Sequence, residues 1–220
     1  LSTSNLYFTI GTATSSNPKK GDKPDGVNLL DAFTVAIGRP GANSVFSVYP
    51  RGGYLWNASS TTLYRWKTSD GSRTSYTITG STGVANAGAD SDYVYVYRGG
   101  GLVDKYTISG GTATLVNTTT INRIPAAYNF TVSNGYVWVA ESGTSAKYYG
   151  YKTSNINGAS ISEDVTITLA GGTGLTTLTT LVWDGTNYWV LDRVSAVSAR
   201  LKKYDSFGVW QADYSLSIDS

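Results

Sequence analysis

Three carboxylates of this chain, Glu141, Asp184 and Asp192, are of the residue type that hydrolyses glycosides. Retaining glycosidases use two carboxyl groups about 5 Å apart, one as an acid and the other as a nucleophile. The chain has no His and no Cys, so it lacks the usual general base, the usual zinc ligands and any imidazole to activate a Ser. Glycoside hydrolysis is therefore the enzymatic activity that these residues could support. We predict no metal site and no cofactor.

Two of these acids occupy equivalent places in an internal repeat, in which one aromatic strand leads through a hairpin to a second. Clear copies lie at 53–68, 92–108, 135–153 and 187–206, and a weaker copy opens the chain at 5–10. Alignment of the copies gives one shared aromatic position, 39 to 51 residues apart along the chain: Phe8, Trp56, Tyr95, Trp138 and Trp189. A period of 40 to 50 residues with several strands in each period is typical of propeller blades.

The side chains of these strands alternate with period two, so both faces of each strand are apolar. Tyr93, Tyr95 and Tyr97 point one way, while Val94 and Val96 point the other. Blades stacked around an axis cover both faces, which a sheet with one wet face does not. We therefore predict one all-β domain, a β-propeller of about five four-stranded blades, at approximately 1–45, 46–80, 83–122, 126–169 and 176–218.

The first of these blades is incomplete in the sequence. The polar insert 11–26, which carries Lys19, Lys20 and Lys23, is predicted to be a solvated loop. Propeller rings usually close by combining strands from both ends of the chain. We expect 214–218 to pair near 5–10, or else a neighbouring subunit to fill the gap.

The repeat favours structural roles for its most prominent residues. Glu141 and Asp192 align with Arg98 and Ser59 of other blades, which predicts hairpin caps or ion pairs rather than catalysis. The aligned aromatics are expected in the core between blades rather than as platforms for sugars. Aromatics outside the repeat register are expected to be exposed, and these are Tyr148 and Trp210.

The loops between second and third strands vary in length, whereas the other hairpin turns are short. The spacing of the aromatics on either side of these loops grows from 10 residues (Trp56 to Trp66) to 15 (Trp189 to Tyr204). Such loops emerge on the same face as the blade connections, where repeat proteins usually bind ligands. The binding residues predicted from this face are Arg98, Glu141, Tyr148, Trp183, Asp192 and Arg193. Asn117 is the candidate acceptor for N-glycosylation.

Two second strands resemble those of known propellers. The segments Tyr136–Ser142 (YVWVAES) and Tyr188–Arg193 (YWVLDR) are similar to the repeat of the NHL and YncE-like families, over about 170 residues of the chain. The resemblance implies the fold and a tendency to bind other macromolecules or glycans. It implies no catalytic residue.

These observations predict a non-enzymatic structural or adhesion protein, extracellular or at a cell or virion surface, because the chain is rich in Ser and Thr and poor in charge. It would bind a protein or glycan receptor or assemble as a homo-oligomer. The alternatives are a lectin propeller and, after it, a glycoside hydrolase. A net charge of +2 gives no basic face for nucleic acid, and no apolar run is long enough to span a membrane.

Overall fold

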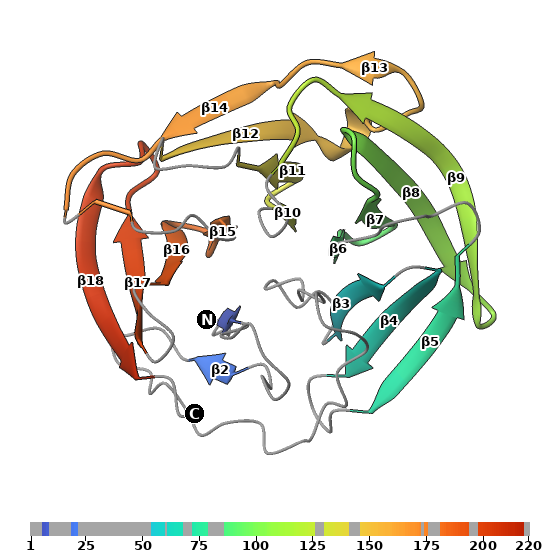
Figure 1. The fold of residues 1–220 in the computed structure, drawn as a ribbon, viewed down its shortest axis with the longest axis horizontal. Helices are drawn as coiled ribbons and strands as arrows, with labels where there is room; N and C mark the ends of the chain where they lie inside the picture. The colour runs from blue at the N-terminus through green and yellow to red at the C-terminus, as the bar shows by residue number, and fades with distance from the viewer. Residues whose placement is uncertain are drawn as a thin grey trace.

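The protein is a ring of antiparallel β-sheets around a central axis (Figure 1). The computed structural model describes residues 6–8, 19–21, 54–59, 61–67, 72–78, 86–125, 130–140, 146–172, 174–175, 181–193 and 198–217. Apart from one turn of 3-10 helix, η1 (Thr153–Asn155), the elements of these residues are strands. The predicted all-β propeller fold is confirmed.

Each sheet is a blade whose strands follow one another from the axis to the rim. One holds β1 (Leu6–Phe8) and β2 (Lys19–Gly21), and the next holds β3 (Tyr54–Ser59), β4 (Thr62–Lys67) and β5 (Arg73–Thr77). The third holds β6 (Asn86–Ala89), β7 (Val94–Tyr97), β8 (Leu102–Ser109) and β9 (Thr112–Ile121). The fourth holds β10 (Phe130–Ser133), β11 (Tyr136–Val139), β12 (Lys147–Lys152) and β14 (Val165–Thr168). The last holds β15 (Leu181–Trp183), β16 (Tyr188–Arg193), β17 (Ser198–Tyr204) and β18 (Trp210–Ser217).

Among the residues with described side chains, the hydrophobic core forms three clusters, and each cluster lies between two successive blades. The strand β7 shows why, because Val94 and Val96 pack toward the β3–β5 blade while Tyr95 and Tyr97 pack toward the β10–β14 blade. Four of the five aligned aromatics are buried, with exposed fractions of 1–6%: Trp56, Tyr95, Trp138 and Trp189; the side chain of Phe8 lies outside the described residues. Their predicted place in the core is confirmed.

The residue that faces the aligned aromatic from the third strand also repeats. In three blades it is a cation whose charged group lies 5.6–6.0 Å from the ring centre: Arg65 over Trp56, Lys105 over Tyr95 and Lys203 over Trp189. In the β10–β14 blade the position is Gly150, opposite Trp138. A Cβ at Gly150 would lie 2.7 Å from the indole of Trp138 and 2.8 Å from Val165, so the ring fills the space that a side chain takes in the other blades.

Two rim contacts tie neighbouring blades together. The expectation that turns between third and fourth strands are short is wrong in this blade, because the chain between β12 and β14 leaves its own blade through η1. It forms β13 (Ser160–Ile161), which pairs in parallel with the end of β9. Gly158 N donates to the Thr119 hydroxyl at 2.8 Å, which holds this excursion against the preceding blade. At the other side Ala170 bridges in parallel to Val209 of the last blade.

The first blade differs from its prediction in two ways. Lys19 and Lys20 lie in β2, paired with β1, rather than in a solvated loop, because pairing across the hairpin overrides their weak strand preference; Lys23 lies outside the described residues. In the described part of the chain β18 pairs with β17 over 198–217, as the fourth strand of its own blade. No described pairing joins it to β1, so the expected closure by the C-terminal strand is not observed.

We expect Gly150→Ala to lower the free energy of unfolding by roughly 1–3 kcal/mol, the usual cost of overpacking a core. Gly150 does not have a positive φ, so the change tests packing alone. The measurement is urea unfolding, with Thr166→Ala at an exposed position of β14 as the control. Equal stability of the two variants would contradict the close approach of Trp138.

Candidate functional site

Asp184, one of the three candidate acids, caps a turn. Its Oδ1 accepts hydrogen bonds from the backbone N–H groups of Thr186 and Asn187, at 2.8 and 2.9 Å. Its Oδ2 accepts from the indole Nε1 of Trp189 at 2.7 Å. All three bonds lie within the turn and the first residues of β16. The carboxylate therefore orders the turn and orients the aligned aromatic.

The same arrangement occurs two blades earlier, at Asp90. Its Oδ1 accepts from the N–H groups of Asp92 and Tyr93 at 2.9 Å, and its Oδ2 accepts from the Tyr95 hydroxyl at 2.7 Å. Burial and the bond to Asp90 raise the pKa of Tyr95 well above its ordinary value. Sequence reasoning missed the hydrogen bond from the aligned aromatic to this Asp. The signal was present, because an Asp lies five residues before the aligned aromatic in both blades.

Asp192 and Arg98 both form ion pairs, which is the role that the repeat predicted. Asp192 is fully buried and accepts from Arg200 Nη2 at 3.1 Å. Arg98 Nε lies 3.3 Å from Oδ2 of Asp104, which is also buried and accepts from the Thr118 hydroxyl at 2.6 Å. Buried charges need such partners, so removal of one member of either pair would destabilise the blade that holds it.

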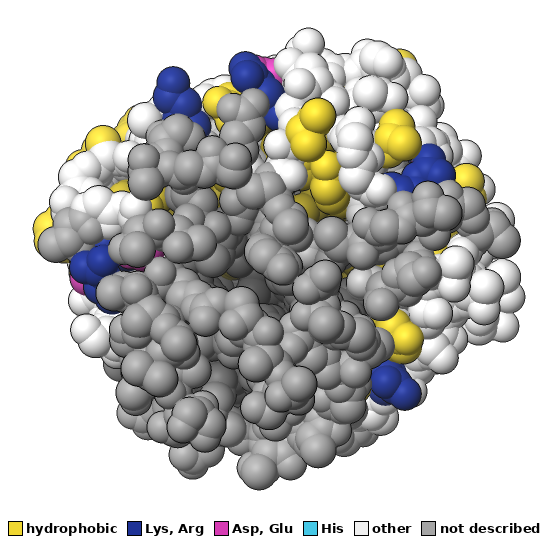
Figure 2. Space-filling model, viewed as in Figure 1, with side chains coloured by type: hydrophobic (Ala, Val, Ile, Leu, Met, Phe, Trp, Pro, Cys, Tyr) yellow, Lys and Arg dark blue, Asp and Glu magenta, His cyan; other side chains and the backbone are white. Residues whose placement is uncertain are grey.

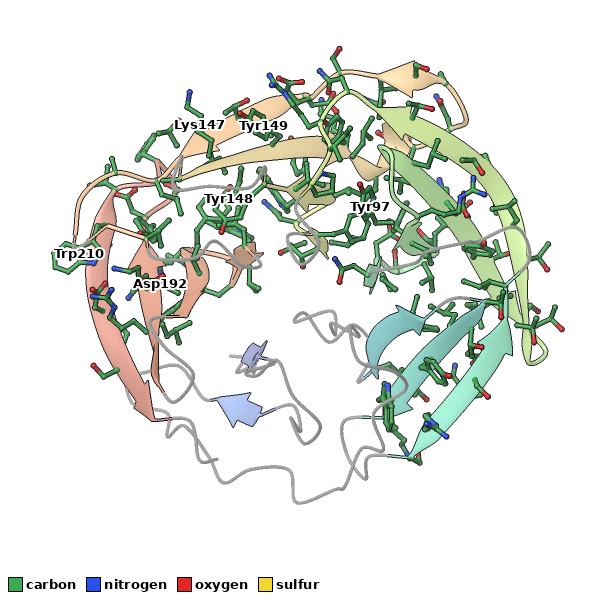
Figure 3. The ribbon with its side chains drawn as sticks, in the orientation of Figure 1. Tyr97, Lys147, Tyr148, Tyr149, Asp192 and Trp210 are labelled. Atoms are coloured by element: carbon green, nitrogen blue, oxygen red, sulfur yellow. The ribbon has the colours of Figure 1, made fainter. Side chains whose placement is uncertain are left out.

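The prediction that Tyr148 is an exposed contact is wrong. It is 1% exposed, in the cluster between the last two blades. Burial, with Tyr204 and Asp192 nearby, raises its pKa well above the ordinary value. The alternation of side chains along β12 directs Tyr148 toward the last blade, which covers this face of β12. Figure 3 shows Tyr148 and Asp192 inside the ring and Trp210 at its outer rim.

Of the remaining predicted residues, the structure describes the side chains of Trp183 and Asn117, which lie in different blades. Trp183 is half-buried, with its ring 4.5 Å from that of Tyr188. Asn117 is half-buried, and its Nδ2 donates to the Ile156 carbonyl at 3.4 Å; its glycosylation stays a prediction. Glu141 and the side chain of Arg193 lie outside the described residues.

Exposed apolar side chains gather at the turn between β17 and β18, which we call the rim turn (205–210). Phe207 is 85% exposed, Val209 49% and Trp210 37%. Strand order places this turn at the short-turn ends of the blade, opposite the variable loops on which binding was predicted. The sequence did single out Trp210 as exposed, and this is confirmed.

The rim turn is held rigidly by its own residues. Asp205 Oδ1 accepts from the N–H groups of Phe207 and Val209 at 2.9 and 3.0 Å, and Asp205 N donates to the Val209 carbonyl at 2.9 Å. Gly208 has a φ of +83°, which any other residue adopts only with strain. Phe207 therefore projects from an ordered loop.

Trp210 is fixed from two sides. Its Nε1 donates to Asp213 Oδ1 at 2.6 Å, and Asp213 Oδ2 lies 3.1 Å from the fully buried Nζ of Lys202. Its ring lies against Gly172, where a Cβ would come within 2.6 Å of it. The indole thus rests on the rim contact between the last two blades.

Among the residues with described side chains, no group of three acids or other ligands is placed to hold a metal ion. No helix in the described part of the chain is long and apolar enough to cross a membrane. On the coloured part of the face in Figure 2, Lys and Arg side chains lie scattered around the rim rather than in one basic patch.

No family model and no curated protein matches the chain. Among solved structures, glutaminyl cyclase of Myxococcus xanthus matches 97% of this chain and 95% of its own, with 10% identity and a TM-score of 0.51. At this identity the likeness concerns the fold. The chain has a β-propeller fold.

Two further structures match less well. A mitotic checkpoint complex chain has 17% identity and a TM-score of 0.43, and Hsv2 of Kluyveromyces lactis has 9% and 0.41. The matches cover 73% and 99% of this chain but only 48% and 66% of those chains. The specific resemblance to the NHL and YncE-like families stays a prediction.

A cluster around Glu163 ties the segment after β9, at Asn122 and Arg123, to the loop that precedes β14 in the next blade. Glu163 accepts from Arg123 Nη2 at 2.9 Å and from Asn122 Nδ2 at 2.6 Å. Asn122 Oδ1 in turn accepts from the Tyr151 hydroxyl at 2.6 Å. The bonds from Arg123 and Asn122 lower the pKa of Glu163 from 4.5 to about 2.

We expect Asp184→Ala to lower the free energy of unfolding by roughly 1–3 kcal/mol, because the Trp189 indole N–H loses its buried acceptor. Asp92→Ala is the control, since this exposed carboxylate accepts a bond from the adjacent Ser91 hydroxyl. Thermal and urea unfolding measure both variants. An Asp184 variant as stable as the control would contradict the turn-capping role.

The lowered pKa of Glu163 predicts a stability term that depends on pH. A carboxyl whose pKa is lower in the folded state stabilises the fold above the unfolded pKa, and this contribution disappears as pH falls through the folded value. Unfolding measured from pH 5 to pH 2 should therefore show the stability advantage of the wild type over Glu163→Gln shrinking across that range. A constant difference would show that Glu163 is not held by Arg123 and Asn122 in solution.

Proposed function

We propose that this propeller is a non-enzymatic binding domain and that the rim turn is its anchor for a protein partner. The observation that carries the proposal is the exposure of Phe207, Val209 and Trp210 on one ordered turn. Isolated exposed apolar residues need no explanation, but a cluster of them with two aromatic rings marks an interaction site.

The rigidity of the rim turn favours binding. Aromatic side chains dominate the free energy of protein interfaces, especially where they enter a pocket of the partner. A loop already fixed by Asp205 and Gly208 loses little conformational entropy when it binds. The surface thus combines a large apolar contact with a small ordering cost.

The engagement of the acids supports a non-enzymatic role. Asp184 caps a turn through three hydrogen bonds, and Asp192 is fully buried against Arg200. Neither is free to transfer a proton to a substrate without loss of a structural bond. The Ser- and Thr-rich composition, with only 15% charged residues, supports a location outside the cell or on the surface of a cell or virion.

A glycan-binding role is the second candidate, because Trp210 offers an exposed indole next to the exposed amide of Gln211. Aromatic faces stack on sugar rings, and amides bind their hydroxyl groups. This role would depend on Trp210 rather than on Phe207.

The test immobilises the wild type, Phe207→Ser and Ile124→Ser and compares the surface proteins that each retains from source cells. Ile124→Ser is the matched control, because Ile124 is also an exposed apolar residue (63% exposed) but lies on the linker between two blades. We expect a protein retained by the wild type and Ile124→Ser to be lost with Phe207→Ser. Once that protein is purified, its dissociation constant should rise at least tenfold, about 1.4 kcal/mol.

Equal retention by all three proteins would overturn the rim turn as the anchor. A glycan array separates the alternative: a signal that is lost with Trp210→Ala and kept with Phe207→Ser would establish a lectin in place of a protein binder.

A further inference from the structure

We propose that the side-chain amine of Lys202 and the carboxyl group of Asp213 condense into an amide, which links β17 covalently to β18. The two residues lie directly opposite each other on these strands, and Lys202 Nζ is 3.1 Å from Asp213 Oδ2. The inference does not depend on the partner of the rim turn, because both reacting groups belong to one chain.

The amine is buried beside the apolar cluster between the last two blades. The side chain of Lys202 is fully buried, and the residue opposite it on β16 is Val190, which is buried in that cluster. Tyr204 of the same cluster follows two residues later on the same face of β17. Burial penalises the charged form of the pair, so transfer of a proton from Nζ to Oδ2 costs less here than in water. The resulting neutral amine is a nucleophile.

The carboxyl group is held in a way that favours attack at its carbon. Asp213 Oδ1 accepts from the indole N–H of Trp210 at 2.6 Å, while Oδ2 faces the amine. When Nζ adds to Cγ, negative charge develops on Oδ1, and a donor that is already in place stabilises it. The two oxygens therefore have different roles, because Oδ1 becomes the amide oxygen and Oδ2 leaves.

The condensation needs no other reactant. Proton transfer within the pair gives an amine and a carboxylic acid. The Nζ–Cγ bond then forms and the Cγ–Oδ2 bond breaks, and Oδ2 leaves as water with the proton of the acid and one proton of the amine. Nothing is oxidised or reduced. The side chain of Asp213 is 20% exposed, so the water can escape to solvent.

The neighbouring phenol adds no charge to this site. Burial, followed by the charges of Asp213 and Asp192, raises the pKa of Tyr204 to about 12. Its hydroxyl therefore stays neutral at neutral pH, and no phenolate forms beside the developing charge on Asp213.

The juxtaposition of amine and carboxyl distinguishes the last blade from the others whose third and fourth strands are described. The equivalent cross-strand pairs there contain no amine: Tyr64 with Ser75, Asp104 with Thr118 and Tyr149 with Thr166. The ion pairs of Arg98, Arg123 and Arg200 use a guanidinium group, which stays protonated and does not attack a carboxyl.

The cross-link closes the loop 202–213, which contains the rim turn. A covalent bond at this place limits the conformations of the unfolded chain, as a disulfide does. The chain has no Cys and so no disulfide of its own. An amide between side chains gives the same constraint and is not cleaved by reducing agents.

Mass spectrometry of the denatured full chain tests the proposal. We expect the wild type, after incubation in the folded state, to weigh one water less than its sequence. Lys202→Arg and Asp213→Ala should have the full mass of their sequences. Lys203→Arg is the matched control and should lose the water, because Lys203 lies on the other face of β17, over Trp189.

Fragmentation of a tryptic digest locates the bond. Trypsin should leave Lys202 uncut in the wild type, and the peptide that contains Lys202 should be joined to the peptide that contains Asp213. This measurement uses the wild type alone, so it does not depend on whether the variants fold.

The rate of bond formation tests the part played by the indole. Trp210→Phe keeps an aromatic ring but lacks the N–H that contacts Asp213 Oδ1. In newly synthesised protein we expect this variant to lose its water about tenfold more slowly than the wild type, or more slowly still. An unchanged rate would overturn the role given to Trp210.

A wild type that keeps the full mass of its sequence after prolonged incubation overturns the cross-link. A loss of water that persists in Lys202→Arg, or that fragmentation places at another residue, overturns it as well. Either result leaves the proposed function standing, because the retention experiment depends on Phe207 and not on Lys202.

Discussion

The blades whose side chains are described are apolar on both faces, so such a blade is stable only when a neighbour covers each face. Burial of one aromatic per blade carries much of this, since truncation of a buried Trp typically costs 3–5 kcal/mol. Tyr95 and Trp189 are held by Asp90 and Asp184 from the preceding turn. Asp90 and Asp184 therefore stabilise the core by fixing the positions of these buried aromatics.

This constraint explains where function can reside. Asp104, Asp184 and Asp192 are engaged in the blades and cannot change partners without cost. Side chains at the rim need not pack between blades in this way, because an outer strand such as β18 lies at the edge of its sheet and has only one neighbouring strand there. Where the rim is covered, the chain itself supplies the cover, as β13 does on β9 and Ala170 does at Val209. Phe207 and Leu115 lie beyond this cover and are exposed.

Repetition made the fold predictable. A period of two within strands and of 39 to 51 residues between aligned aromatics specified the blades, their strand order and the burial of Trp56 and Trp138. The same logic anticipated ion pairs at Arg98 and Asp192. It failed at Tyr148, where position outside the aromatic register was taken as exposure, although β12 is covered by the next blade.

The sequence by itself determined the blades, because local alternation and short Gly turns need no knowledge of distant residues. Only the tertiary structure decided which acids were engaged, since the bond from Arg200 to Asp192 and the path of β13 to the preceding blade depend on how the sheets meet. It also added the rim turn as a candidate site, while the two longest variable loops, 141–145 and 194–197, lie outside the described residues. Exposure of Phe207 is a property of the folded surface, and no pattern along the chain encodes it.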